Sequence, residues 1–437
     1  MWPYHPDLLA TPVPRYTSYP TAAEFSDAVG AEHQARALAE CDGEVSLYLH
    51  IPFCERICWY CGCNTGAANR KQRVASYIEA LHREIALVAR AIPAGTRINT
   101  ISFGGGSPNA IAPMQFVALV QELTVRFGAL DADWSIELDP RSLTPDWQPT
   151  LKCVGVRRAS LGVQTFAPAL QEAIGRVQPD ADIVRSVDLL RGAGVTSLNF
   201  DLMYGLPGQS LGDLEDTLAR TVELGADRVA LFGYAHVPHM LPRQVRIDAS
   251  RLPDAAERFA MAAFGYEYLT AAGYQAVGFD HFARPSDPLA VAAREGRLRR
   301  NFQGFTEDPA ETLIGLGATS ISCFPEVIVQ NEKNAGRYRM LLSQDRLAGD
   351  RGVLRSADDQ RRGRIIEQLL CHNRARVDAD LRRDVEGPLA AYLASGLCAF
   401  AGDELVIAPE GLPYARSIAA RFDAWRPSSA HRFSSAV

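Results

Sequence analysis

The sequence lacks the features that would mark a secreted, membrane-spanning or nucleic-acid-binding protein. Its 437 residues contain no apolar run long enough to cross a bilayer, and residues 1–15 lack the basic start and apolar stretch of a signal peptide. The net charge of −6 gives no excess of the cations that phosphate contacts require. The nine cysteines are odd in number and unevenly spaced, which makes a poor disulfide framework. We therefore expect a cytoplasmic protein, with no membrane span and no nucleic-acid partner.

Repeated strand–helix units predict a parallel sheet with helices outside it. About six such units fit before residue 240, fewer than the eight of a closed TIM barrel, so an incomplete, open barrel is expected. One buried helical stripe is marked by apolar residues three or four positions apart, at Val74, Ile78, Leu81, Ile85 and Val88. The predicted strands of this region are Val45–His50, Ile98–Phe103, Trp134–Asp139, Arg158–Val163, Thr196–Tyr204 and Arg228–Tyr234.

The chain divides into three predicted parts. Residues 1–43 are rich in proline and cannot form a long helix. They form either a floppy terminus or an arm that covers the active site, and Arg15 with the nearby aromatic residues favours the arm. Residues 44–325 are expected to form the barrel and its extension. Within them, residues 241–325 are expected to form helix and irregular segments. Residues 326–437 are expected to be mostly helical and winged-helix-like, with a helix near 358–371, a hairpin within 396–408 and a closing helix near 413–424.

Three cysteines in one early loop carry the strongest chemical signal. Cys54, Cys58 and Cys61 have the spacing Cys-x3-Cys-x2-Cys directly after the first strand. Thiolates suit iron–sulfur clusters or zinc. A structural zinc site usually needs a second pair of Cys or His, and Cys63 is cramped as a fourth ligand. Three ligands on a four-iron cluster leave one iron open, and the amino and carboxylate groups of S-adenosylmethionine (SAM) can chelate it.

This cysteine spacing after the first strand of an α/β barrel resembles the radical SAM signature. Further segments resemble the oxygen-independent coproporphyrinogen III oxidase family, and together they span nearly the whole chain. These segments are Arg15–Ala22, Tyr48–Asn64, Phe232–His236, Asp280–Pro285, Asn301–Phe305 and the ending Arg432–Ser435.

The resemblance implies a fold, an activity and cofactors. The fold would be α/β, an incomplete (β/α)6 radical SAM barrel with an N-terminal arm and a mainly helical C-terminal domain. The activity would be the anaerobic oxidative decarboxylation of two propionates of coproporphyrinogen III to vinyl groups, giving the haem precursor protoporphyrinogen IX. The resemblance also implies a [4Fe–4S] cluster, two SAM molecules per chain, a 5′-deoxyadenosyl radical, an electron donor such as a flavodoxin or ferredoxin, and a monomer.

The resemblance places two sets of residues around the two SAM molecules. Around the first are Tyr48, Gly105, Glu137 and Ile321, and around the second are Tyr60, Gly106, Ser107, Gln164, Arg176, Asp201 and Ala235. From the residues alone, the glycines after the second strand also fit a plain turn, and Glu137 also fits an ordinary acid at a strand end. Asp201 lies within a very apolar strand, where a lone charge must be ligand-bound or paired with an arginine.

Cys63 and His50 are further candidates near the active site. Cys63 is either a spare thiol or a residue with a role in the reaction, and His50 is either a proton donor or a satisfied strand histidine. Arg15 is a candidate cation for the tetracarboxylate substrate. Two other functions fit the same scaffold: a haem-binding trafficking protein and an anaerobic haem-degrading enzyme. Cys63, the arm and the full second-SAM set argue against the trafficking protein.

Overall fold

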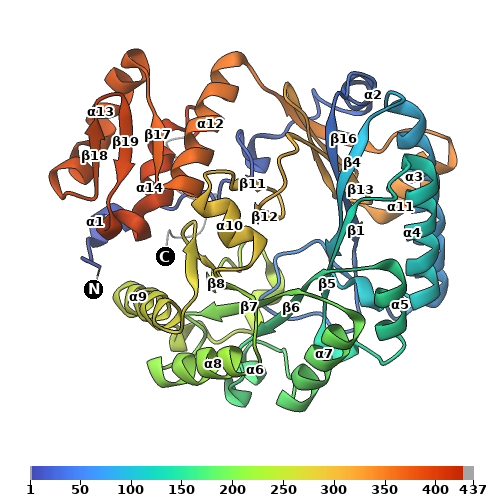
Figure 1. The fold of residues 1–437 in the computed structure, drawn as a ribbon, viewed down its shortest axis with the longest axis horizontal. Helices are drawn as coiled ribbons and strands as arrows, with labels where there is room; N and C mark the ends of the chain where they lie inside the picture. The colour runs from blue at the N-terminus through green and yellow to red at the C-terminus, as the bar shows by residue number, and fades with distance from the viewer. Residues whose placement is uncertain (1, 427–437) are drawn as a thin grey trace.

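The computed structural model describes residues 2–426, and its largest feature is one curved sheet of twelve strands (Figure 1). Six neighbouring strands of this sheet are parallel and follow one another in chain order, as the strand–helix pattern predicts. They are β1 (Glu44–Ile51), β4 (Arg97–Gly105), β5 (Asp133–Leu138), β6 (Arg158–Gln164), β7 (Ser197–Tyr204) and β8 (Arg228–Gly233). Their carboxyl ends share one edge, which is where parallel sheets bind ligands.

The helices that connect these strands lie on the outer face of the sheet (Figure 1). They are α3 (Lys71–Ala91), α4 (Pro113–Phe127), α5 (Trp147–Val154), α7 (Asp180–Ala193) and α8 (Leu211–Glu223). The apolar stripe predicted on α3 is confirmed, because all five of its residues are buried. Burial of such stripes is the main force that fixes the helices to the sheet.

The sheet continues beyond the six parallel strands at both edges. On one edge β13 (Thr312–Leu316) pairs with β1 in parallel, and the antiparallel strands β14 (Ile321–Cys323), β15 (Val327–Asn331) and β16 (Gly349–Leu354) follow. On the other edge, β10 (His281–Ala283) pairs antiparallel with β8, and β9 (Gln275–Val277) pairs antiparallel with β10. The boundary expected at residue 325 therefore falls between two hydrogen-bonded strands, β14 and β15.

The last part of the chain packs helices against a small sheet. The predicted helix near 358–371 is α12 (Ala357–His372), and the predicted hairpin is formed by β18 (Cys398–Ala401) and β19 (Glu404–Ile407). β17 (Arg374–Arg376) completes the sheet, and α13 (Ala379–Ala394) precedes the hairpin. α14 (Ala415–Ala419) is shorter than the closing helix expected over 413–424, because 3-10 turns flank it. Nowhere in residues 2–426 is a helix long and apolar enough to cross a membrane.

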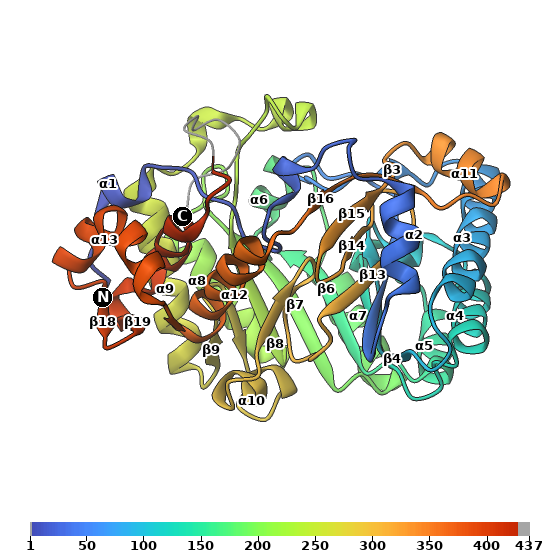
Figure 2. The same ribbon diagram turned by 90° about the horizontal axis from the view of Figure 1, so that it is seen from above.

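The N-terminal arm is packed along its length rather than floppy. Figure 2 shows it passing from α13 at one end of the molecule to α2 (Ala31–Ala39), which lies beside the β13–β16 strands. Its first part buries Leu9, Val13 and Tyr16 in the core of the C-terminal helices. Its second part joins the main sheet through α2, where the Gln34 amide donates to the Asn331 side chain. The arm therefore contacts both the C-terminal helices and the main sheet.

Glu84 holds α3 to the extension of the sheet through a buried hydrogen-bond network. Its carboxylate accepts hydrogen bonds from the Gly317 backbone and the Tyr338 hydroxyl, and from the Asn331 amide, each at 2.6 Å. Tyr338 lies on α11 (Ala335–Ser343). Burial raises the pKa of Glu84 from 4.5 to about 7, and the three hydrogen bonds only partly oppose that rise.

We predict that Glu84→Ala lowers the melting temperature of the protein by several degrees. The substitution leaves three buried donors without their acceptor, which costs about 3 kcal/mol. Glu79→Ala, on the exposed face of the same helix, is the matched control and should melt like the parent. Because the folded-state pKa is raised, Glu84 stabilises the fold most at low pH and loses that contribution as the pH rises through about 7. Calorimetry from pH 5 to 8 should show a steeper fall in stability for the parent than for Glu84→Ala.

Candidate active site

The three-cysteine loop begins at the carboxyl end of β1 and is held there by backbone hydrogen bonds. Cys54 lies on the short strand β2 (Phe53–Cys54), which pairs in parallel with β3 (Gly66–Ala67). The Gly66 amide donates to the Pro52 carbonyl at 2.7 Å, and the Ala68 amide donates to the Cys54 carbonyl at 2.9 Å. The two ends of the loop are thus fixed together, so that the cysteines between them are held over the sheet edge.

The structure brings all four cysteines of this loop together. Burial, and then the nearby Cys61, Asp139 and Cys58, raise the pKa of the Cys54 thiol to about 12. The Cys63 thiol forms a hydrogen bond with Cys61, which lowers the pKa of Cys61. Cys63 is therefore in direct contact with a predicted cluster ligand.

The arrangement fits an iron–sulfur cluster better than a single metal ion. Within residues 2–426 no three His, Cys, Asp or Glu side chains converge closely enough to hold one ion. A zinc site would need such convergence, with each sulfur about 2.3 Å from the metal. Each thiolate of a four-iron cluster binds a different iron, so the sulfurs can stand farther apart. Cys54, Cys58 and Cys61 would hold the cluster.

Two buried arginines donate hydrogen bonds to the Cys58 sulfur. Arg176 donates to the Cys58 sulfur at 3.1 Å, and Arg141 donates to the same sulfur at 3.3 Å. Asp139 forms an ion pair with each of them, at 2.6 Å with Arg141 and 3.4 Å with Arg176. The resemblance places Arg176 around the second SAM and does not predict its contact with Cys58. Arg141 was missed because its only signal is its place two residues after a strand-end acid. Such hydrogen bonds suit a metal-bound thiolate.

The glycine turn after β4 leaves room for its neighbours. A Cβ atom on Gly105, whose φ is +109°, would stand 2.4 Å from the His50 ring, and one on Gly104 would stand 2.7 Å from the Glu137 carboxyl. The Gly105 amide donates to the Glu137 carboxylate at 3.2 Å. A Cβ on Gly106 would stand 2.6 Å from the Phe53 carbonyl. These glycines let the cysteine loop, His50 and Glu137 meet at one place.

Glu137 and Asp201 face the same cavity inside the curved sheet. This cavity of about 200 Å³ also contacts Ser160, Asn199 and His281. Burial and the nearby Asp201 raise the pKa of Glu137 to about 7. Asp201 accepts hydrogen bonds from Ser160 at 2.9 Å and from Asn199 at 2.8 Å. In the described part of the chain these neutral groups, rather than an arginine, are its partners, and burial raises its pKa.

The residues predicted around the second SAM lie near the cysteine loop. The Gln244 amide bridges the Tyr60 and Ala235 carbonyls at 3.1 Å each. Arg176 lies close enough to Tyr60 to interact with it electrostatically. Gln164 ends β6 in the left-handed region, with a φ of +68°, and Ser107 is buried beside the loop, its amide donating to the Phe53 carbonyl.

The residues predicted around the first SAM lie on β1 and its neighbours. The Tyr48 hydroxyl is 3.2 Å from the His50 ring nitrogen. Tyr48 pairs with Gly315 on β13. A Cβ atom on Gly315 would stand 2.6 Å from the Ile321 carbonyl, so Gly315 lies between Tyr48 and Ile321. Burial lowers the pKa of His50 to about 4, which keeps the ring neutral at physiological pH. A neutral, hydrogen-bonded ring fits the satisfied strand histidine. The ending Arg432–Ser435 lies outside the described residues.

Comparisons with known proteins identify the class of the chain. Residues 48–221 match the Radical SAM superfamily, a stretch that contains the cysteine loop and most of the parallel strands. The fold and motif therefore define a radical SAM protein, a class whose cofactors are a [4Fe–4S] cluster and SAM.

The full chain is similar to a narrower group. It is 42% identical over 424 residues to the oxygen-independent coproporphyrinogen III oxidase of Bradyrhizobium diazoefficiens, covering 94% of each chain. It is 36% identical to the enzyme of that name from Pseudomonas aeruginosa, covering 97% and 96%. The solved coproporphyrinogen III oxidase (HemN) of Escherichia coli superposes with a TM-score of 0.91 at 34% identity, covering 97% and 100%. The chain belongs to the oxygen-independent coproporphyrinogen III oxidase family.

We predict that Cys54→Ala, Cys58→Ala and Cys61→Ala each abolish the iron–sulfur absorbance and SAM cleavage after anaerobic reconstitution. Each removes one of only three thiolates that can hold the cluster. Cys63→Ala should keep its iron, and Cys153→Ala, at an exposed thiol of α5, is the control for general oxidation. Iron and sulfide analysis checks all five. Full cluster content in any one of the three ligand variants would contradict the assignment.

Proposed function

We propose that the chain catalyses the anaerobic oxidative decarboxylation of two propionates of coproporphyrinogen III to vinyl groups, giving protoporphyrinogen IX in haem biosynthesis. One observation carries this proposal: in a chain of this family, the three-cysteine loop and the cavity that holds Glu137 and Asp201 meet at the same edge of the sheet. At each propionate a hydrogen atom, carbon dioxide and one electron are lost.

The roles of the site residues form part of the proposal. Cys54, Cys58 and Cys61 bind the cluster, and two SAM molecules occupy the sites described above. When bound, the cluster and the first SAM supply one-electron cleavage of a carbon–sulfur bond and so the power to remove a hydrogen atom. Glu137, anchored by the Gly105 amide, binds ribose hydroxyls, and Asp201 binds the second SAM. Gly105, Gly106 and Ser107 lie beside the cofactor, where glycine allows a close approach of the backbone.

The division of the chain into parts is also proposed. Six strand–helix units form an incomplete radical SAM barrel, the arm over residues 1–43 covers the active site, and the C-terminal helices with their three-stranded sheet form a winged-helix-like domain. The packing of the arm against both the barrel extension and the C-terminal core supports this division. A cytoplasmic monomer that receives electrons from a flavodoxin or ferredoxin completes the proposal, and the free thiols of all nine cysteines fit a reducing compartment.

We predict that the reconstituted, reduced protein converts coproporphyrinogen III to protoporphyrinogen IX without oxygen, and that it releases 5′-deoxyadenosine and carbon dioxide. Chromatography of the oxidised porphyrins and of the nucleoside checks both. The Cys54→Ala variant is the control for reactions that do not need the cluster. Tight retention of haem with no SAM cleavage would instead identify a haem carrier, and methyl transfer to haem would identify a haem-degrading enzyme.

We predict that Asp201→Ala keeps the cluster but weakens SAM binding by roughly tenfold, the size expected for the loss of a charge-assisted hydrogen bond. Asp188→Ala, at an exposed acid of α7, is the matched control. Equilibrium dialysis with labelled SAM, together with iron analysis, measures both quantities. An Asp201→Ala protein that binds as many SAM molecules as the parent, and as tightly, would refute the role given to this residue.

A further inference from the structure

Positive side chains gather on the two segments that form and cover the cysteine loop. Residues 53–73 and 239–252 carry a local excess of cations, although the net charge of the whole chain is −6. Their only acids are Glu55 and Asp248. The seven cations, all exposed except the half-buried Arg243, are Arg56, Arg70, Lys71, Arg73, Arg243, Arg246 and Arg251. The site described above uses none of them.

The second of these segments lies directly on the cysteine loop. It contains the 3-10 turn Pro242–Arg246. Arg243 donates to the Thr65 hydroxyl at 3.2 Å, and the guanidinium of Arg246 stands 5.9 Å from the centre of the Trp59 ring. Two of the cations therefore contact the loop that carries the three predicted cluster ligands.

Two further cations belong to the loop or adjoin it. Arg56 lies within the loop, and its carbonyl accepts a hydrogen bond from Arg141, the residue that also donates to Cys58. Arg73 lies in the first turn of α3, with its guanidinium 5.8 Å from the centre of the Phe53 ring. Cations from three separate segments thus meet at the cysteine loop.

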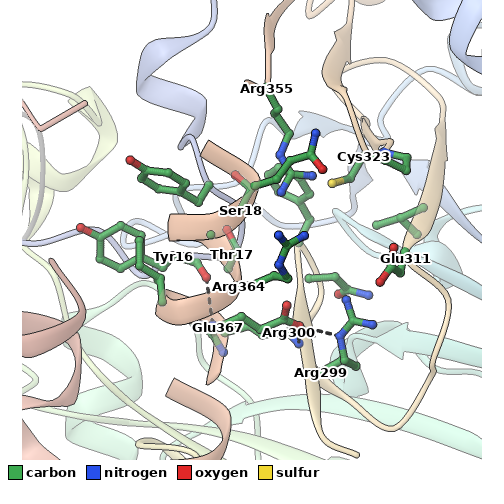
Figure 3. A pocket seen from close by; sticks show the side chains of 18 of the residues that line it. Tyr16, Thr17, Ser18, Arg299, Arg300, Glu311, Cys323, Arg355, Arg364 and Glu367 are labelled. Atoms are coloured by element: carbon green, nitrogen blue, oxygen red, sulfur yellow. Dashed lines mark hydrogen bonds and ion pairs between the residues drawn. The ribbon is translucent and has the colours of Figure 1, made fainter. Parts of the chain in front are cut away.

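The cations at the loop do not hold the chain together through ion pairs. Within residues 2–426 none of the seven forms one. Arginines elsewhere do: Arg15 stands 3.6 Å from Asp280, and Arg299 of β11 (Arg299–Asn301) pairs with Glu367 at 2.8 Å. Arg299 and Glu367 line the cavity between the arm, β11 and α12 that Figure 3 shows. The charges at the cysteine loop are therefore left on the surface, where a partner can reach them.

Apolar side chains lie among these cations. Met240 is 55% exposed and Val245 is 75% exposed, and both belong to the segment that covers the loop. Arginine and methionine are enriched in protein–protein interfaces, so a surface that exposes both fits a protein partner. None of the seven cations lines the cavity that holds Glu137 and Asp201. This surface is therefore separate from the cavity in which we expect the reaction.

The chemistry of the cluster indicates what kind of protein fits this surface. Each cleavage of SAM consumes one electron, which a reductant must deliver to the cluster. Electron transfer is fast only over a short distance, so the donor must dock close to the cysteine loop. The net negative charge of the chain repels an acidic donor, whereas the cations at the loop attract it. Such a field steers the donor to the loop.

We propose that Arg56, Arg73, Arg243 and Arg246 form the docking surface for an acidic protein that carries single electrons to the cluster. The inference rests on the proposed function, in which the reduced cluster cleaves SAM, and it names the surface that the donor uses. The donor loses one electron and the cluster gains it before SAM is cleaved. Complexes of electron carriers are small and weak, so charge rather than buried area directs the encounter.

The test measures binding of oxidised flavodoxin, a small acidic flavoprotein, to the reconstituted protein by titration calorimetry at low salt. Arg56→Glu, Arg73→Glu and Arg246→Glu should each raise the Kd by about fivefold or more. The difference should shrink as salt screens the charges. Arg90→Glu, at an exposed position of α3 about 25 Å along the helix from Arg73, is the matched control and should bind like the parent. Coproporphyrin III, the stable oxidised form of the substrate, should bind the parent and all four variants equally.

The rate of cluster reduction gives a second readout. In stopped-flow absorbance, flavodoxin hydroquinone should reduce the three loop variants roughly tenfold more slowly than the parent. Reduced methyl viologen, a small cation, should reduce them at least as fast as the parent, which shows that the cluster is intact.

The outcomes separate this inference from the proposed function. A parent that does not bind flavodoxin, or binds it without salt dependence, would overturn the docking surface, and so would loop variants that bind it as tightly as the parent. Variants that lose affinity for coproporphyrin III alone would also overturn it, because the cations would then serve the substrate. A parent that binds flavodoxin and is reduced by it, yet converts no coproporphyrinogen III, would overturn only the proposed function.

Discussion

The convergence of three thiols on one loop is the constraint on which the rest of the active site depends. Sulfurs held close together and away from water resist ionisation, as the raised pKa of Cys54 shows. Two arginines held at fixed positions offset this cost. Arg141 and Arg176 both donate to Cys58, and Asp139 holds the two guanidinium groups in place. The cysteine loop, the residues that follow β5 and the segment that holds Arg176 are therefore arranged by one charge requirement.

A parallel sheet makes this arrangement possible because it collects strand ends that are far apart in the sequence. The cysteine loop follows β1, the glycine turn follows β4, and Glu137 stands at the end of β5. The sheet also leaves a side that the parallel strands do not cover. There the arm crosses between the strand extension and the C-terminal helices, with Tyr16 in one core and Gln34 bonded to the other. The arm thus connects the C-terminal core to the strand extension of the main sheet.

Much of the fold and of the site could be predicted from the sequence, but only where a short sequence pattern indicates it. Two patterns are local: the spacing of Cys54, Cys58 and Cys61, and the apolar stripe on α3. The first indicates a cluster site, and the second predicts the buried face of the helix. The strands β13 to β16 were not predicted, because they are three to six residues long and β13 and β15 are buried throughout, so neither shows alternation. Arg141 carries no local signal. Its contact with Cys58 exists only because the fold brings these distant residues together.

The net negative charge of the chain gives no indication of where its buried positive charges lie. A net charge of −6 excludes a broad basic face, yet buried positive charge gathers at two places near the sheet edge, one at Cys58 and one at Asp280. Both use arginine, and a lysine would serve poorly there. Burial lowers the pKa of Arg416 only to about 10, so its charge survives at neutral pH, whereas an equally buried ammonium would lose its proton more readily. Arginine keeps a permanent charge where water cannot help to hold one, which suits hydrogen bonding to the buried Cys58 sulfur.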